Sequence, residues 1–159
     1  ILLKEMYPDF PVQLIQIADT KKPYLENEPF HFSISHGGDY AAAMVSKTHR
    51  VGVDVELLNE KIEQIQHKFI YEDELKVLNE QCPMPAIQCL TLYWSIKESV
   101  FKWWGRGDID FSECMRVEKS TLLPSGILNA RFQKDNFTAS LELHYQLSNE
   151  LSLVWLNND

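Results

Sequence analysis

Hydrophobic and polar positions alternate strictly in the first third of the chain, which is the pattern of half-buried strands. The alternation over residues 30–35 places three large apolar side chains on one face of a predicted strand. A Gly-Gly-Asp turn follows, and residues 40–46 are predicted as a second strand. Residues 51–56 alternate again, with three valines expected to face the core.

The middle of the chain has the spacing of helices. Apolar residues recur every three or four positions in three segments, at residues 60–69, 72–80 and 86–104. Prolines break the chain before the last of these segments, and Gly105 is predicted to end it. Strand patterns return in four segments, at residues 115–121, 127–133, 138–145 and 151–156. This order predicts an α+β fold with helices packed on antiparallel sheet.

Composition narrows the class of protein. The chain has 159 residues, of which 45% are hydrophobic and 24% charged, as in one soluble globular domain. Fifteen basic and 23 acidic residues give a net charge of −8, which argues against nucleic-acid binding. A local basic pocket for an anionic ligand is compatible with that charge. No apolar run is long enough to span a bilayer, so we expect no membrane partner.

Three cysteines without metal-ligand spacing indicate neither a disulfide scaffold nor a structural zinc site. We therefore expect a reducing, cytoplasmic location. The chain begins Ile-Leu-Leu-Lys, without an initiator methionine or the plan of a signal peptide. We expect the sequence to start inside a longer gene product.

Two acidic residues two positions apart form the first candidate site. Asp54 and Glu56 share one face of their strand, about 7 Å apart along the backbone. Like charges this close need a cation or solvent, and hard oxygen ligands favour Mg²⁺ or Mn²⁺. Gly52 is expected to leave room for a ligand to approach the backbone. The alternative is a polar strand face in water.

The longest predicted helix carries charges within an apolar face. Glu98 and Lys102 are four residues apart and share a side of the helix, and Lys97 is adjacent to Glu98. A structural interpretation makes Glu98 and Lys102 a stabilising pair, at about 0.2–0.5 kcal/mol. A functional interpretation makes Glu98 a third metal carboxylate, with the lysines binding phosphate. We expect Asp54, Glu56 and Glu98 to converge on one site.

A histidine beside two glycines is the third candidate. His36 follows the first predicted strand, where it and nearby backbone N–H groups could bind an anion. The alternative is a turn histidine with a local hydrogen bond. Ser35 and His36 do not indicate a serine hydrolase, because adjacent strand residues point to opposite faces and no acidic partner is evident.

Taken in order, the three segments resemble the 4′-phosphopantetheinyl transferase superfamily, most closely its two-lobed, surfactin-synthetase-activating type. The family patterns are S-H, (V/I)-G-(V/I)-D-(V/I)-E and W-x-x-K-E-(A/S)-x-x-K, and all three are present. Lys22-Pro23 also resembles a short family element, although Lys21 replaces its glycine. The W-x-x-K-E pattern is the most specific, and the resemblance covers residues 21–105.

The resemblance implies transfer of the phosphopantetheine group of coenzyme A to a serine of an apo acyl or peptidyl carrier protein, releasing 3′,5′-ADP. Carried onto this sequence, the Mg²⁺ ligands are Asp54, Glu56 and Glu98. The coenzyme A contacts are Lys22, His36, Lys97 and Lys102. Glu98 and Lys102 would act in catalysis, as acceptor of the serine proton and as the phosphate contact.

The resemblance also implies one transferase domain over residues 1–159, in two pseudo-repeated lobes. Residues 1–51 would form a shortened first lobe and residues 52–159 the second. An incomplete lobe would expose sheet edge, so we expect a homo-oligomer or a missing N-terminal segment. The main alternative is a non-catalytic relative that binds coenzyme A or a carrier protein. An unrelated Mg²⁺-dependent phosphotransferase lacks support, because the chain has no P-loop.

Overall fold

The structure is a computed structural model, and it describes residues 1–158. Its nine strands are β1 (Gln16–Ile17), β2 (Pro23–Tyr24), β3 (His31–Gly37), β4 (Tyr40–Ser46), β5 (Arg50–Leu57), β6 (Met115–Val117), β7 (Ser125–Lys134), β8 (Phe137–Leu147) and β9 (Leu151–Asn158). Its α-helices are α1 (Leu2–Met6), α2 (Lys61–Ile65), α3 (Glu72–Gln81), α4 (Ala86–Trp104) and α5 (Phe111–Cys114). Two short 3₁₀ turns are η1 (Val12–Leu14) and η2 (Gln66–Lys68).

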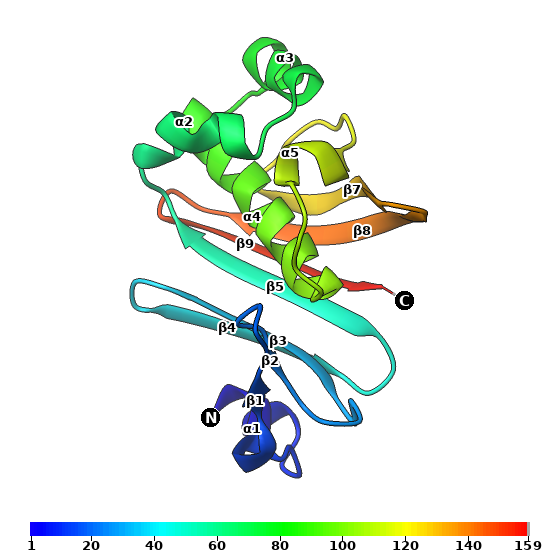
Figure 1. The fold of residues 1–159 in the computed structure, drawn as a ribbon. Helices are drawn as coiled ribbons and strands as arrows, with labels where there is room; N and C mark the ends of the chain where they lie inside the picture. The colour runs from blue at the N-terminus through cyan, green and yellow to red at the C-terminus, as the bar shows by residue number, and fades with distance from the viewer. Residues whose placement is uncertain (159) are drawn as a thin grey trace.

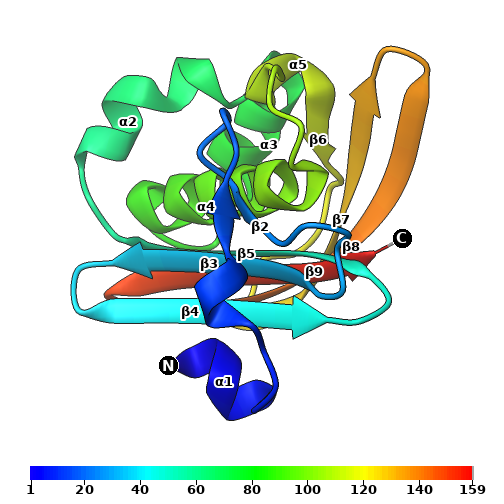
Figure 2. The same ribbon diagram turned by 60° about the horizontal axis from the view of Figure 1, so that its bottom comes forward.

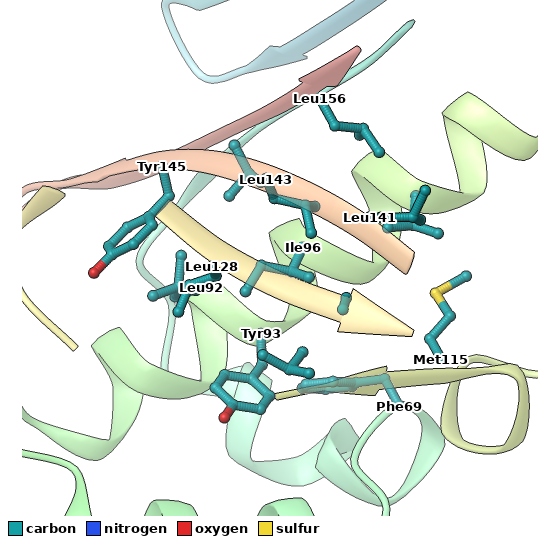
Figure 3. Close-up of a cluster of buried hydrophobic side chains, with 14 of the residues drawn as sticks. Phe69, Leu92, Tyr93, Ile96, Met115, Leu128, Leu141, Leu143, Tyr145 and Leu156 are labelled. Atoms are coloured by element: carbon teal, nitrogen blue, oxygen red, sulfur yellow. The ribbon is translucent and has the colours of Figure 1, made fainter. Parts of the chain in front are cut away.

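An antiparallel sheet and one long helix form the main core. The sheet has the strand order β5-β9-β8-β7-β6, and α4 packs across β5 and β9 (Figure 1). Figure 2 shows α2, α3 and α5 on the outer side of α4. Buried side chains of α4, such as Leu92 and Ile96, meet Leu128, Leu141 and Leu143 of the sheet (Figure 3). The predicted α+β class, with helices on antiparallel sheet, is confirmed.

A second, smaller apolar cluster lies in the N-terminal part of the chain. It consists of Leu3, Phe10, Leu25 and Phe32. The β3–β4 hairpin of this part lies beside β5 (Figures 1 and 2). Side-chain hydrogen bonds connect β3 of this hairpin to β5: the Oγ atoms of Ser33 and Ser35 accept hydrogen bonds from backbone N–H groups of β5. A pocket lined by residues of both parts lies where they meet.

Strand β5 differs from the half-buried strand that its alternation predicts. Residues 51–55 are all buried, because α4 covers one face while β4 packs near the other. Gly52 faces α4, and a Cβ there would lie 2.1 Å from the carbonyl oxygen of Ser99. The expectation that Gly52 admits a ligand is therefore wrong, since the space is needed for the approach of the helix.

The other predicted elements are largely confirmed. Helix α4 has the predicted bounds, and Gly105 ends it in the left-handed conformation at φ 69°. Strand β6 stops at Val117, four residues early, because it pairs only with Ala130–Phe132 and the following residues are exposed. The helix predicted over residues 60–69 is divided into α2 and η2.

The cysteines differ from expectation. Cys82 and Cys89 form a disulfide across the proline-containing turn that leads into α4, with their Cα atoms 6.9 Å apart. The sequence indicated no disulfide scaffold and gave no signal for this single bridge, which forms because the turn returns the chain toward the first turn of α4. Within residues 1–158, the helices are all too short or too polar to cross a membrane.

Candidate active site

A pocket of about 560 Å³ lies between the β3–β4 part of the chain and α4. Strands β3 and β5, the β1–β2 segment and the C-terminal half of α4 all contribute to its wall. Six of the seven residues that the sequence predicts for the site line it: Lys22, His36, Asp54, Glu56, Glu98 and Lys102. The pocket therefore gathers acidic and basic groups that are up to 80 positions apart in the chain.

Asp54 is the most deeply buried acid of the pocket, with 2% of its surface exposed. Its Oδ1 accepts hydrogen bonds from Lys102 Nζ at 2.7 Å and from Ser35 Oγ at 3.0 Å. Its Oδ2 is buried and has no hydrogen-bond partner. An unpartnered buried carboxylate oxygen is costly, and binding a cation would remove that cost.

Glu56 and Glu98 add two more carboxyl groups. Glu56 Oε1 accepts a hydrogen bond from Trp94 Nε1 at 3.1 Å. Burial, followed by the negative charge of Asp54, raises the pKa of Glu56. The same two causes, in the same order, raise the pKa of Glu98 to about 7. The three carboxyl groups therefore interact electrostatically across one pocket.

The donor set fits a hard divalent cation. Carboxylate oxygens are the ligands that Mg²⁺ and Mn²⁺ prefer, and the orphaned Oδ2 of Asp54 supplies a free acceptor. Among residues 1–158, no three acidic, histidine or cysteine side chains already have the spacing of a metal centre. The Lys102 ammonium instead contacts Asp54 and provides local positive charge. Side-chain adjustment would be needed for all three acids to reach one ion.

Lys102 pairs with a different acid from the one its helix position suggests. Its ion pair is with Asp54 of β5, at 2.7 Å, rather than a stabilising pair with Glu98 along α4. Its Nζ also donates to Ser35 Oγ at 2.8 Å. The structural interpretation of a Glu98–Lys102 helix pair is therefore wrong, because β3 and β5 offer Lys102 closer partners.

Ser35 is a site residue that the sequence analysis missed. Its hydroxyl contacts Asp54 and Lys102 and also accepts the backbone N–H of Val55, at 3.2 Å. The available signal was the pair of serines at alternate positions of β3, which place two hydroxyls toward β5. The S-H pattern includes Ser35 without giving it a role, and its observed partners give it an orienting role.

The two other predicted basic residues, His36 and Lys22, also line the pocket. His36 is exposed at the end of β3. Lys22 extends across the C-terminal end of α4, where a Cβ on Gly105 would lie 2.2 Å from its Nζ. Burial lowers the pKa of Lys22, and nearby Glu28 opposes this effect. Besides Lys102, the pocket thus has basic groups available for an anionic ligand.

Lys97 does not line the pocket. Its ammonium is fully buried, donates to Glu74 Oε2 at 2.6 Å and to the carbonyl oxygen of Met115 at 3.3 Å, and also contacts the carbonyl oxygen of Phe69. Adjacent helical residues point about 100° apart, so Lys97 and Glu98 face different surroundings. The structure therefore does not bring Lys97 together with the other predicted coenzyme A contacts, and its assignment as one of them stays a prediction.

Comparisons with known proteins agree with the motif resemblance. A family model described as the 4′-phosphopantetheinyl transferase superfamily matches residues 50–153. The chain is 31% identical to the 4′-phosphopantetheinyl transferase gsp of Aneurinibacillus migulanus over 104 residues, covering 60% of this chain and 44% of that protein. It is 32% identical to psf-1 of Bacillus pumilus, also a 4′-phosphopantetheinyl transferase, over 110 residues, or 67% of this chain and 46% of that protein. The matched region spans less than half the length of either relative.

Proposed function

The chain belongs to the 4′-phosphopantetheinyl transferase superfamily, and we propose that it transfers the 4′-phosphopantetheine group of coenzyme A to a carrier-protein serine. The second product would be 3′,5′-ADP. The main supporting observation is one pocket that contains Asp54, Glu56 and Glu98 together with Lys102. The relatives' names support the same reaction class.

Transfer of a phosphoryl group requires charge neutralisation and in-line placement more than covalent catalysis. Asp54, Glu56 and Glu98 would hold Mg²⁺, and Mn²⁺ would suit the same ligands. The bound ion would polarise the pyrophosphate of coenzyme A and help to orient it. The unpartnered Asp54 Oδ2 is the observation that best supports this ligand set.

The basic side chains would bind and orient coenzyme A. We assign Lys102 to the pyrophosphate, where its ammonium would balance the charge that develops during transfer. Ser35 restrains that ammonium through a 2.8 Å hydrogen bond. Lys22 and His36, which line the same pocket, would contact the other phosphate groups. Aliphatic and aromatic residues on the wall, including Ile17 and Phe101, would accompany the less polar arm.

The attacking serine hydroxyl must lose its proton as its oxygen bonds to phosphorus. We assign Glu98 as the acceptor, because it is a half-buried carboxylate in the wall of the pocket. The P–O bond to 3′,5′-ADP breaks as the new bond forms, and the ADP phosphate departs as an anion. No group on the chain becomes covalently modified in this sequence.

The partner would be an apo acyl or peptidyl carrier protein. Such proteins are usually acidic, and this chain also has a net charge of −8. Net like charge slows association, so docking would depend on local basic and apolar residues around the pocket. The carrier and its pathway are to be identified by assay.

Incubation with coenzyme A, Mg²⁺ and a panel of apo carrier proteins tests the proposal. Intact-mass measurement should show at least one carrier gaining one phosphopantetheine group, and a chelator should abolish the gain. A non-catalytic relative would bind coenzyme A or a carrier without changing the carrier's mass. That result across the panel, from folded protein in Mg²⁺, would refute the transferase assignment.

A further inference from the structure

A buried ion pair lies on the side of α4 away from the pocket. Lys97 and Glu74 side chains are 0% and 4% exposed, with Nζ and Oε2 2.6 Å apart. Lys97 also donates to the carbonyl oxygens of Phe69 and Met115. One side chain of α4 is therefore attached to three separate segments of the chain.

Glu74 is bonded through both of its carboxylate oxygens. Oε2 also accepts the backbone N–H of Tyr71, at 2.9 Å, at the start of α3. Oε1 accepts the backbone N–H of Val117, at 2.8 Å, in β6. The pair thus connects α3, α4 and β6 through a fully hydrogen-bonded carboxylate.

The next residue along α4 faces the candidate site. Since Lys97 is anchored, the rotation of α4 about its axis is restrained at the turn that carries Glu98. Side chains extend about 5–6 Å from a helix axis, so a rotation of about 10° would move their ends by about 1 Å. A displacement of about 1 Å in reacting groups can cost about 10²-fold in rate.

We propose that Lys97 and Glu74 are positioning residues that hold α4 at the rotation where Glu98 and Lys102 face Asp54. The proposal rests on the proposed function for the effect on catalysis. A buried ion pair is weak evidence for stability, because well-packed apolar residues often replace one without loss. We infer instead that the pair fixes the direction in which Glu98 and Lys102 extend from α4. The competing interpretation is a direct contact between Lys97 and coenzyme A.

Substitution of the pair separates these interpretations. Lys97→Met and Glu74→Gln would be made singly and together, because both replacements keep approximate side-chain size. Lys76→Met is the matched control, since Lys76 forms an exposed 3.3 Å ion pair with Asp73 on α3. Circular dichroism and thermal unfolding would verify folding. If Lys97→Met does not fold, Glu74→Gln still weakens the ion pair and retains an acceptor oxygen.

We expect each folded variant of the pair to lower kcat about tenfold while changing the KM for coenzyme A less than twofold. The double variant should be little worse than the more damaging single variant, because each removes the same interaction. The control should match the parent. Direct contact instead predicts a raised KM in Lys97→Met and little effect of Glu74→Gln, and that result would overturn the positioning role.

A second readout does not require transfer. The rise in thermal midpoint on adding Mg²⁺ without coenzyme A should be smaller in the pair variants than in the parent and the control. Parental kcat and a parental Mg²⁺ response in the folded double variant would overturn the positioning role alone. If Mg²⁺ raises the thermal midpoint of the parent but the parent transfers nothing, the transferase assignment is refuted. The Mg²⁺ response of the pair variants, compared with that of the parent, still decides the positioning role. A parent with neither response would overturn both proposals.

Discussion

Three carboxyl groups of the candidate pocket, those of Asp54, Glu56 and Glu98, are partly or fully buried and repel one another when charged. Burial and the charge of Asp54 raise the pKa of both neighbouring glutamates. Lys102 relieves part of this conflict through its contact with Asp54 Oδ1, while Oδ2 stays unpartnered. Such an arrangement favours ligand binding over stability, and its cost can be measured in single variants.

Glu98→Gln should stabilise the metal-free protein at alkaline pH. The pKa of Glu98 is raised from 4.5 to about 7 in the folded state, so the folded protein binds this proton more tightly than the unfolded chain. Its stability contribution is therefore lost as pH rises through this window. The gain in the free energy of unfolding at pH 8 should be up to about 3 kcal/mol. Urea denaturation at pH 8 and near pH 4.5 checks this, because the gain should shrink at the lower pH. An equal or negative effect at pH 8 would contradict the burial of Glu98.

Lys102→Ala should reduce transfer by about 10²–10³-fold, the usual effect of removing one electrostatic contact to a transition state. A surface lysine would instead alter stability slightly and activity hardly at all. The rate would be measured at saturating Mg²⁺ with folding verified, and Lys76→Ala is the exposed control. Activity within a few-fold of the parent would remove Lys102 from the site.

At the level of elements, the close contact of β5 with α4 determines the geometry of the site. Strand alternation places Asp54 and Glu56 on the face toward the helix, together with Gly52. The absence of a side chain at Gly52 lets the backbone of α4 approach at Ser99, one residue after Glu98. The distance between acids on the two elements therefore depends on this glycine.

Gly52→Ala should destabilise the fold by about 1–3 kcal/mol, the usual cost of overpacking a core. The new Cβ would lie 2.1 Å from a backbone oxygen of α4, whereas at Gly126 it would lie 3.3 Å from the ring of Tyr145. Gly126→Ala is therefore the milder control. Chemical denaturation of both variants gives the comparison. Equal stability of Gly52→Ala and the parent would show that α4 does not need this contact.

The spacing of apolar residues along the sequence predicted the bounds of helices and strands better than it predicted which elements pack against them. The bounds of α4 and β4 follow directly from local patterns and from Gly105 as a helix end. Local patterns could not show that β5 is covered on both faces, because its partners come from segments distant in sequence. For the same reason the Lys97–Glu74 pair was missed, since the two residues are 23 positions apart.

Across the whole molecule, the site lies where the N-terminal part meets the larger core. The two parts have separate apolar clusters, and Ser33 and Ser35 join β3 to β5 between them. The division into lobes at residues 1–51 and 52–159 and the expected homo-oligomer stay predictions. The motifs predicted six of the charged and histidine side chains that line the pocket, because their order along the chain matches the family. The role of Ser35 required the contact between parts, which no single segment encodes.

The central claim is that this pocket performs phosphopantetheinyl transfer, and the mass of a carrier protein tests it most directly. A responsive apo carrier would be incubated with coenzyme A, Mg²⁺ and either the parent, Asp54→Ala or Asp73→Ala. Asp73 is an exposed acid on α3 and serves as the control. We predict that the parent and the control add one phosphopantetheine group, whereas folded Asp54→Ala adds none. Equal transfer by Asp54→Ala and the parent would contradict the account.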